Sequence, residues 1–354
     1  MTMLYRQRLL LALAELAGGE LDEAKARLLV MLLSVDAQRE RRQAPYEFVV
    51  WGKHWRSFVL EHDLQTLRLR RYLTPPPRVA LAAAATGTSF LSRLRPDDRR
   101  LLEQVWEESQ GFAADQRSAL RLLGRELAAS SLPKEVSRGA EEAVCLFTLG
   151  YEGLSLDAYL SLLLSHGVRL LVDVRRNPFS HKFGFARRRL AQALYEVGIA
   201  YLHLPALGVP SELRRELATE ESYRALFVHY ATDLLPQARA SIERLAALIA
   251  EQRRVALTCF EADPGHCHRA VLAAYLQQQG YIEAPIVHLM CNAVSHPARQ
   301  NLSSHDQRQQ ILPALDDSSP CSSLGRSSTS GSSQRAAAGS RNGTIIFYKA
   351  IYWI

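Results

Sequence analysis

The sequence predicts an α/β protein whose main domain contains a largely parallel sheet with helices on both faces. Within residues 144–290, short apolar segments alternate with segments of helical spacing. Strands and helices that alternate in this way are joined by right-handed crossovers, which make the strands parallel. The apolar run at residues 168–174 is too continuous for a half-exposed strand, so we expect that strand to be buried on both faces.

Capping and breaking residues predict the elements of this domain. Ser155 is a suitable cap for a helix that stops at Gly167, and Gly198 and Gly280 end two further helices. The longer insertion at residues 205–236 is a candidate lid over the site. We predict strands at residues 144–149, 168–174, 199–204, 255–259 and 286–289, and helices at residues 155–166, 186–197, 237–252 and 268–279.

The part of the chain before this domain is predicted to be mainly helical. Leucines at helical spacing indicate helices at residues 4–17 and 21–33, and the segments 46–51 and 69–73 read as strands on either side of a helix at 57–67. This arrangement suggests a winged-helix-like module. We therefore divide the chain into that module at residues 1–78, a helical connector at 79–142, the α/β domain at 143–294 and a low-complexity tail at 295–354.

The tail has a different composition from the rest of the chain. Between residues 318 and 340 it is dominated by Ser, Gly, Arg and Ala, a composition that does not bury enough surface to fold alone. We expect residues 295–354 to be disordered and their end to be a fused or out-of-frame extension.

The overall composition limits the class of protein. The 354 residues carry a net charge of +7, with 47% hydrophobic and 22% charged residues, as in soluble globular proteins. The basic charge favours an anionic partner, either nucleic acid or a phosphorylated small molecule. Five cysteines, an odd number, argue against a disulfide framework, and no apolar run is long enough to cross a membrane. We expect a cytoplasmic protein without a membrane partner, and the oligomeric state is left open.

The first candidate for chemistry is the pair Asp173 and Arg175, which ends a predicted strand. In open parallel sheets, ligands bind beyond the carboxyl ends of the strands. An arginine there can hold a phosphate or carboxylate in two-point contact while the aspartate orients it. Alternatively, the two side chains form an ion pair that only fixes the following loop. That loop, residues 179–189, mixes cations with aromatic rings, a pattern suited to a phosphate backbone and unpaired bases or simply to a solvated helix start.

The second candidate is the segment 259–269, which joins a predicted strand to a helix. Cys267 falls near the first turn of that helix, where the helix dipole favours a thiolate. His268 is a candidate general base, and Arg269 is a candidate anion contact. The other interpretation is that Cys259 and Cys267 are buried structural thiols. We expect no bound cofactor, with zinc held by Cys259, His266, Cys267 and His268 as the lesser alternative.

Several motifs together resemble the family catalogued as domain of unknown function 488. They are Phe-Thr-Leu-Gly-Tyr-Glu at 147–152, Asp-Val-Arg at 173–175, Tyr-Leu-His-Leu-Pro-Ala-Leu-Gly at 201–208, Cys-Phe-Glu-Ala-Asp at 259–263 and Cys-His-Arg at 267–269. The N-terminal part is similar to the winged-helix-like module of that family's extended members. The resemblance implies a compact α/β domain without an established activity. It also implies shared polar positions at Asp173, Arg175, Ser180, Glu261, Cys267, His268 and Arg269.

These observations lead to two functional hypotheses. In the first, the α/β domain is an enzyme-like domain for a phosphate-bearing substrate, such as nucleic acid or a nucleotide. Arg175, Ser180 and Arg269 would bind the substrate, and the chemistry would fall to Asp173, Glu261, Cys267 and His268. In the second, the protein is a non-catalytic regulator that binds DNA or senses a ligand.

Overall fold

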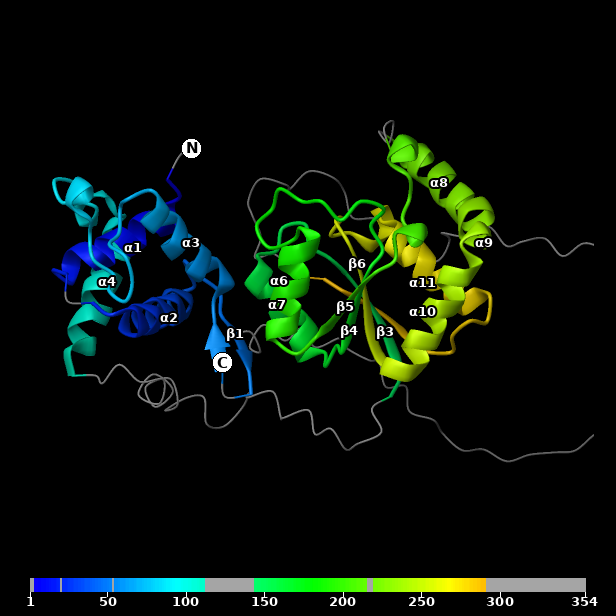
Figure 1. Ribbon diagram of the computed structural model, residues 1–354, viewed down its shortest axis with the longest axis horizontal. Helices are drawn as coiled ribbons and strands as arrows, with labels where there is room; N and C mark the ends of the chain where they lie inside the picture. The colour runs from blue at the N-terminus through cyan, green and yellow to red at the C-terminus, as the bar shows by residue number, and fades with distance from the viewer. Residues whose placement is uncertain (1–2, 20, 53, 112–142, 215–218, 291–354) are drawn as a thin grey trace, which may run out of the picture. The chain divides into compact units, whose positions relative to one another are not determined.

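The computed structural model describes residues 3–19, 21–52, 54–111, 143–214 and 219–290 (Figure 1). Within these ranges a mainly helical N-terminal region precedes an α/β domain. The predicted tail, like most of the second half of the connector, lies outside the described residues. None of the helices in the described ranges combines the length and the apolar character that a bilayer crossing requires.

The N-terminal region contains helices around one hydrophobic core and a two-stranded antiparallel hairpin. The core is made largely of leucines from the predicted helical segments, so the amphipathic spacing identified these helices correctly. The elements are α1 (Tyr5–Leu16), α2 (Glu23–Arg39), β1 (Val49–Trp51), β2 (His54–Arg56), α3 (Phe58–Leu69) and α4 (Pro96–Glu108), with short 3₁₀ turns at Ala83–Ala85, Leu91–Arg93 and Ser109–Gly111.

The hairpin differs from the strands predicted for this region. Only the last three residues of the predicted strand 46–51 form β1, and its partner β2 follows directly after a turn at Gly52, which has a φ of 56°. The predicted strand at 69–73 is wrong. Leu69 is the last residue of α3, and Leu73 makes an isolated bridge to Leu81. A short apolar run after a helix reads equally well as a strand or as the last helical turn.

The side chain of Asp157 connects α6 (Leu156–Ser165) to the start of α3. One carboxylate oxygen accepts a hydrogen bond from the Phe58 amide at 2.7 Å, and the other accepts from the Val59 amide and the Ser57 hydroxyl, each at 3.0 Å. Asp157 is completely buried, and this burial raises its pKa to about 7. Because the first amides of a helix have no partner within the helix, this carboxylate caps α3 from a distant part of the chain.

The α/β domain is built on a five-stranded sheet with the order β5-β4-β6-β3-β7. Every adjacent pair in this sheet is parallel, so the prediction of a parallel sheet is confirmed. The strands are β3 (Cys145–Gly150), β4 (Leu170–Asp173), β5 (Ala200–His203), β6 (Arg254–Cys259) and β7 (Ile286–Leu289).

Helices cover both faces of this sheet, also as predicted (Figure 1). Successive side chains of a strand point to opposite faces. Leu171 and Ala256 therefore pack with α6 and α7, whereas Val172 and Leu257 pack with α10 and α11 on the other face. The helices are α6 (Leu156–Ser165), α7 (Arg187–Glu196), α8 (Glu220–His229), α9 (Leu235–Gln237), α10 (Arg239–Gln252) and α11 (His268–Gln278).

The insertion at residues 205–236 is not one long loop. It contains two 3₁₀ turns, Pro205–Leu207 and Ser211–Arg214, then α8, and a π-helical turn at Tyr230–Leu234 that continues into α9. Tyr230 is buried in the core on the α10–α11 face of the sheet. Its hydroxyl donates a hydrogen bond of 2.5 Å to the Leu207 carbonyl. The insertion is thus anchored at both ends to the core on the α10–α11 face.

Candidate functional site

The candidate site lies where the central strand of the sheet ends. Strand β6 lies between β4 and β3. The chain leaves β3 and β4 toward α6 and α7, but it leaves β6 toward α11, which packs on the opposite face. Neighbouring strands whose connections diverge in this way leave a crevice at their carboxyl ends, the place where open α/β sheets bind ligands.

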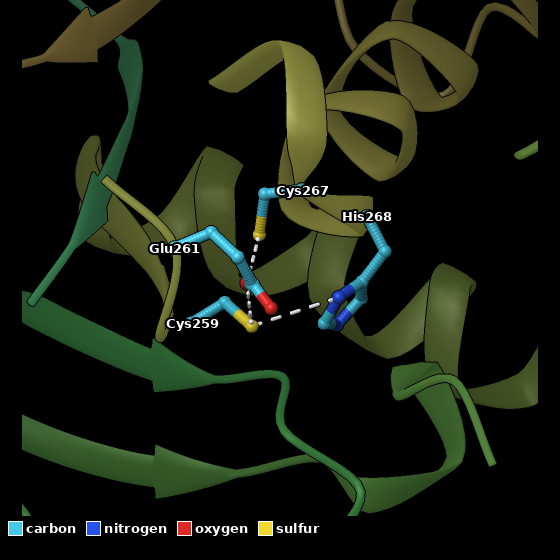
Figure 2. Close-up of side chains that lie close together, drawn as sticks. All are labelled: Cys259, Glu261, Cys267 and His268. Atoms are coloured by element: carbon cyan, nitrogen blue, oxygen red, sulfur yellow. Dashed lines mark hydrogen bonds between the residues drawn. The ribbon is translucent and has the colours of Figure 1, made fainter. Parts of the chain in front are cut away.

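Four chemically reactive side chains gather at this point: Cys259, Glu261, Cys267 and His268 (Figure 2). Each of them offers one potential ligand atom, and these four atoms lie within 4.8 Å of one another. The Cys259 and Cys267 thiols both donate to Oε2 of Glu261, at 3.1 and 3.0 Å, and Cys259 Sγ is 3.6 Å from Nδ1 of His268. The sequence grouped Glu261 with Cys267 and His268 as a candidate catalytic residue, but the zinc alternative did not include it.

Local geometry explains how one short segment supplies all four groups. Cys259 is the last residue of β6, and Cys267 and His268 begin α11. Between them, Asp263 starts a 3₁₀ turn by accepting a hydrogen bond from the Gly265 amide at 2.8 Å. The chain therefore reverses within a few residues, and the strand end and helix start face each other.

Gly150 and Arg269 hold the backbone of this segment in place. A Cβ atom on Gly150 would lie 1.7 Å from the Glu261 carbonyl oxygen, so β3 approaches the segment as closely as a residue without a side chain allows. The Arg269 guanidinium donates to the carbonyls of Glu261 and Ala262 at 2.5 and 3.0 Å. Its position in the first turn of α11 thus fixes the loop that carries Glu261.

Burial controls the protonation of the cluster. Cys259 and Cys267 are each 1% exposed and His268 is 5% exposed, whereas Glu261 is only partly buried. Burial raises the pKa of the Cys267 thiol well above its usual value. Burial alone would also raise the pKa of Glu261, but hydrogen bonds from the two thiols outweigh it and leave that pKa below its usual value. These two shifts favour a protonated Cys267 thiol that donates to an ionised Glu261 carboxylate.

Asp173 and Arg175 form a buried ion pair beside the cluster. The guanidinium of Arg175 binds the carboxylate with two nitrogens, at 2.8 and 2.5 Å, and also donates to the Tyr151 hydroxyl and the Phe185 carbonyl. Asp173 in turn accepts a hydrogen bond of 2.8 Å from the Tyr201 hydroxyl. This geometry accords with the alternative in which the pair positions the following loop.

The two predicted motifs do meet. Nε2 of His268 is 3.1 Å from the Val174 carbonyl oxygen. The positive charges of Arg175 and Arg269 both lower the pKa of the buried Tyr159 hydroxyl, which burial, the largest influence, raises. Both guanidinium groups thus lie within electrostatic reach of one hydroxyl. However, Arg269 is completely buried and hydrogen-bonded to backbone carbonyls, and its Nε has no hydrogen-bond partner.

Two other predicted residues lie around the cluster rather than in it. Ser180 is partly buried in the loop after β4, where its hydroxyl accepts a hydrogen bond from the Lys182 amide at 3.2 Å. His266, which the zinc alternative included, faces Asp263 and Glu220 with its two ring nitrogens at 3.0 and 2.8 Å. Glu261 occupies the place in the cluster that the zinc alternative gave to His266.

Sequence reasoning missed two polar residues of β5. The Tyr201 hydroxyl binds Asp173, and His203 contacts the Arg175 carbonyl at 2.8 Å through Nε2. Residues two apart on a strand point to the same face. Applied to β5, that periodicity would have placed both side chains on one face of the strand, and the pairing of β5 with β4 brings them beside the Asp173–Arg175 pair.

Several arginines of the N-terminal region are already paired with carboxylates. Arg27 pairs with Glu23 and Glu61, and Arg68 also pairs with Glu23. Further ion pairs join Arg6 to Asp63 and Arg42 to Asp98. An arginine that already binds a carboxylate has to give up that partner before it can bind a phosphate.

Comparisons with known proteins agree with the resemblance seen in the sequence. Neither the curated proteins nor the solved structures gave a match. One family model matches, at residues 155–276, with the description "Domain of unknown function DUF488". The matched range runs from the start of α6 into α11 and contains the whole four-residue cluster. Residues 155–276 of the α/β domain therefore match the DUF488 family.

Proposed function

We propose that the α/β domain is an enzyme-like domain that binds a phosphate-bearing ligand with an aromatic base at the carboxyl edge of its sheet. The observation that carries this proposal is the segment 176–189, which combines exposed cations with an exposed aromatic ring and begins two residues after Val174, the contact of His268. Arg175 and Arg269 are engaged within the protein, so the phosphate contacts fall to the exposed cations of that segment.

The positive charge of this segment is concentrated at the start of α7. Arg187, Arg188 and Arg189 occupy its first turn and are exposed, and no acidic residue accompanies them there. Arg176 and His181 add two more exposed groups. Cations at a helix N-terminus are repelled by the positive end of the helix dipole and by one another. A bound anion reduces both repulsions. Arginine binds a phosphate, as it binds a carboxylate, in two-point contact.

Two exposed rings favour a base on that ligand. Phe179 is 62% exposed and Phe260 is 44% exposed. Phe260 contacts the ring of Tyr151 at 5.3 Å, and the Tyr151 carbonyl accepts a hydrogen bond of 2.9 Å from Lys182. The segment is therefore tied to the residue directly before Glu261. Exposed rings beside cations are the pattern that stacks unpaired bases.

The chemistry of the site then rests on acid–base groups. Glu261 is the most accessible member of the cluster and its lowered pKa keeps it ionised, so it is the group in position to accept a proton from a substrate or a water molecule. Cys267 is 1% exposed and its pKa is raised, which does not favour an attacking thiolate. His268 and Asp173 position this centre through Val174 and Arg175.

The direct test is binding of a nucleoside triphosphate and of a single-stranded oligonucleotide to the full chain. We expect Arg187→Ala with Arg188→Ala to weaken binding of the preferred ligand about tenfold. The slope of affinity against salt should also fall by about one unit for each phosphate that the two arginines neutralise. The matched control is Arg239→Ala with Arg244→Ala, which removes two exposed arginines from α10. Equal affinity in both double variants would overturn the proposed binding surface.

Turnover is tested separately from binding. Glu261→Gln keeps the shape of the side chain and removes its charge. We expect this variant to bind the ligand found above with unchanged affinity but to lose about a hundredfold or more of any hydrolytic or transfer rate, since general acid–base groups contribute on that scale. A rate equal to that of the unmodified protein would remove Glu261 from the chemistry.

A further inference from the structure

We propose that Cys259, Glu261, Cys267 and His268 bind one zinc ion. Tetrahedral zinc sites in proteins use thiolate, imidazole and carboxylate ligands, and this cluster supplies two of the first and one of each of the others. The inference concerns metal content and does not depend on the ligand of the exposed arginines.

The distances fit a shared metal ion. The four candidate ligand atoms lie within 4.8 Å of one another, and Figure 2 shows the four side chains pointing toward a common centre. Ligands about 2.0–2.3 Å from a tetrahedral zinc are separated from each other by roughly 3–4 Å. The cluster therefore needs only small side-chain adjustments to surround an ion. In the other described residues, no comparable group of metal-binding side chains is found.

His268 is oriented as a ligand. Because the Val174 carbonyl accepts a hydrogen bond from Nε2 at 3.1 Å, the proton of the neutral ring belongs on that nitrogen. Nδ1 then carries a free lone pair, and it faces Cys259 within the cluster. Metal-binding histidines typically donate their second ring nitrogen to a carbonyl or carboxylate in this way, which fixes the ring and strengthens the ligand.

The charge balance of zinc binding is favourable. Zinc displaces one proton from each thiol, so two neutral thiols and Zn²⁺ become a zinc dithiolate and two released protons. With the Glu261 carboxylate, the zinc-bound cluster would carry one negative charge. Arg269 is completely buried at the same helix end and is bonded to carbonyls, so its positive charge complements that of the loaded site.

Three of the four ligands are fixed and one is accessible. Cys259, Cys267 and His268 are buried at the strand end and helix start, whereas Glu261 lies on the intervening loop and is partly exposed. Zinc sites that keep three protein ligands and one exchangeable position are the catalytic type. The geometry therefore assigns Glu261 to the exchangeable position.

Metal content and cobalt spectroscopy of the full chain test this proposal. We expect about one zinc per chain after growth with added zinc, and cobalt substitution to produce the near-ultraviolet band of thiolate coordination together with intense tetrahedral visible bands. Cys259→Ser and Cys267→Ser should each weaken metal binding about tenfold or more and lower the thiolate band. Glu261→Ala should keep the metal and the thiolate band but shift the visible bands.

The matched control is Cys145→Ser. Cys145 is also a buried cysteine of this domain, but its thiol faces the Pro285 carbonyl at 3.5 Å, far along the strand from the cluster. This variant should bind metal as the unmodified chain does. Circular dichroism of each variant separates loss of metal from loss of fold. A folded unmodified chain without stoichiometric zinc, or unchanged metal content in the Cys259→Ser and Cys267→Ser variants, would overturn the site.

Discussion

Nε2 of His268 lies 3.1 Å from the carbonyl oxygen of Val174, and this hydrogen bond joins the first residue of α11 to the chain that follows β4. It connects two sequence motifs that lie 94 positions apart. It also determines which imidazole nitrogen faces the two thiols. One hydrogen bond thus links the architecture of the sheet to the chemistry of the cluster.

Zinc should stabilise the protein in proportion to its affinity. A ligand that binds only the folded state adds about 2.7 kcal/mol at a free concentration of about 100 times its Kd. For a domain of this size we expect a rise in Tm of roughly 5–10 °C when zinc is added to chelator-stripped protein. Differential scanning calorimetry measures the shift. A rise of the same size in Cys259→Ser with Cys267→Ser would show that zinc acts elsewhere.

Gly150→Ala should disturb the cluster without touching any of its four residues. The added Cβ would lie 1.7 Å from the Glu261 carbonyl oxygen, so either β3 or the loop has to move. We expect a loss of about 1–3 kcal/mol in the free energy of unfolding, typical of overpacked sites, and weaker cobalt binding. Gly87→Ala is the control, because nothing lies within 4 Å of its added Cβ. Equal stability of the two variants would contradict the close approach of β3 to the loop.

Removing one partner of the Asp173–Arg175 pair should lower the free energy of unfolding more than replacing both partners with apolar residues. Both side chains are nearly inaccessible, with side-chain exposures of 0% and 6%. Arg175→Met leaves a buried carboxylate without its cation, and we expect a loss of about 3–5 kcal/mol in urea unfolding. The double variant Asp173→Leu with Arg175→Met should be less destabilised than Arg175→Met alone, because no buried charge is left without a partner. Glu243→Gln, which breaks the exposed pair with Arg239, should change stability by less than about 1 kcal/mol.

Asp157 should make stability depend on pH. Its pKa is raised from 3.8 to about 7 by burial, so the folded state favours the protonated form. This group's contribution to stability is fully present below about pH 4 and is lost as the pH rises to about 7. The change amounts to about 4 kcal/mol at 1.36 kcal/mol per pKa unit.

Unfolding of the unmodified chain and of Asp157→Asn between pH 4 and pH 8 isolates that contribution. The difference in unfolding free energy between the two proteins should change over this interval and level off above pH 7. Asp22→Asn, which replaces the exposed carboxylate that caps α2 with an amide that also caps, should run parallel to the unmodified chain. Parallel curves for Asp157→Asn would show that Asp157 does not titrate in this range.

The sequence predicted the elements of the α/β domain well because each has a strong local signal. Ser155 caps α6 by accepting a hydrogen bond from the Ala158 amide, as its position suggested. Gly167 and Gly198 follow the ends of α6 and α7 with positive φ values. The order of the strands was not predictable in the same way. A run of apolar residues indicates that a strand is buried, but it does not indicate which strand lies beside it.

The site was predicted in part for a related reason. The convergence of Val174 and His268 follows from the rule that parallel strands present their carboxyl ends at one edge. The membership of the cluster depends instead on the short turn that begins at Asp263, which brings Glu261 between the thiols and turns His266 outward. Such a turn depends on contacts with Gly150 and Arg269, and no spacing within the segment itself reveals them.

The strand order also has a consequence for how the chain is assembled during synthesis. β3 is the first strand of the sheet to be made, yet its two neighbours are β6 and β7, and 109 positions separate Leu149 from its hydrogen-bond partner Thr258. During synthesis, β3 therefore cannot pair with either neighbour until nearly the whole domain has left the ribosome. Sheets that depend on such non-local pairing fold slowly. The four residues of the cluster lie at the end of β6 and the start of α11, which are among the last elements to be synthesised. The site therefore forms only when the sheet is completed.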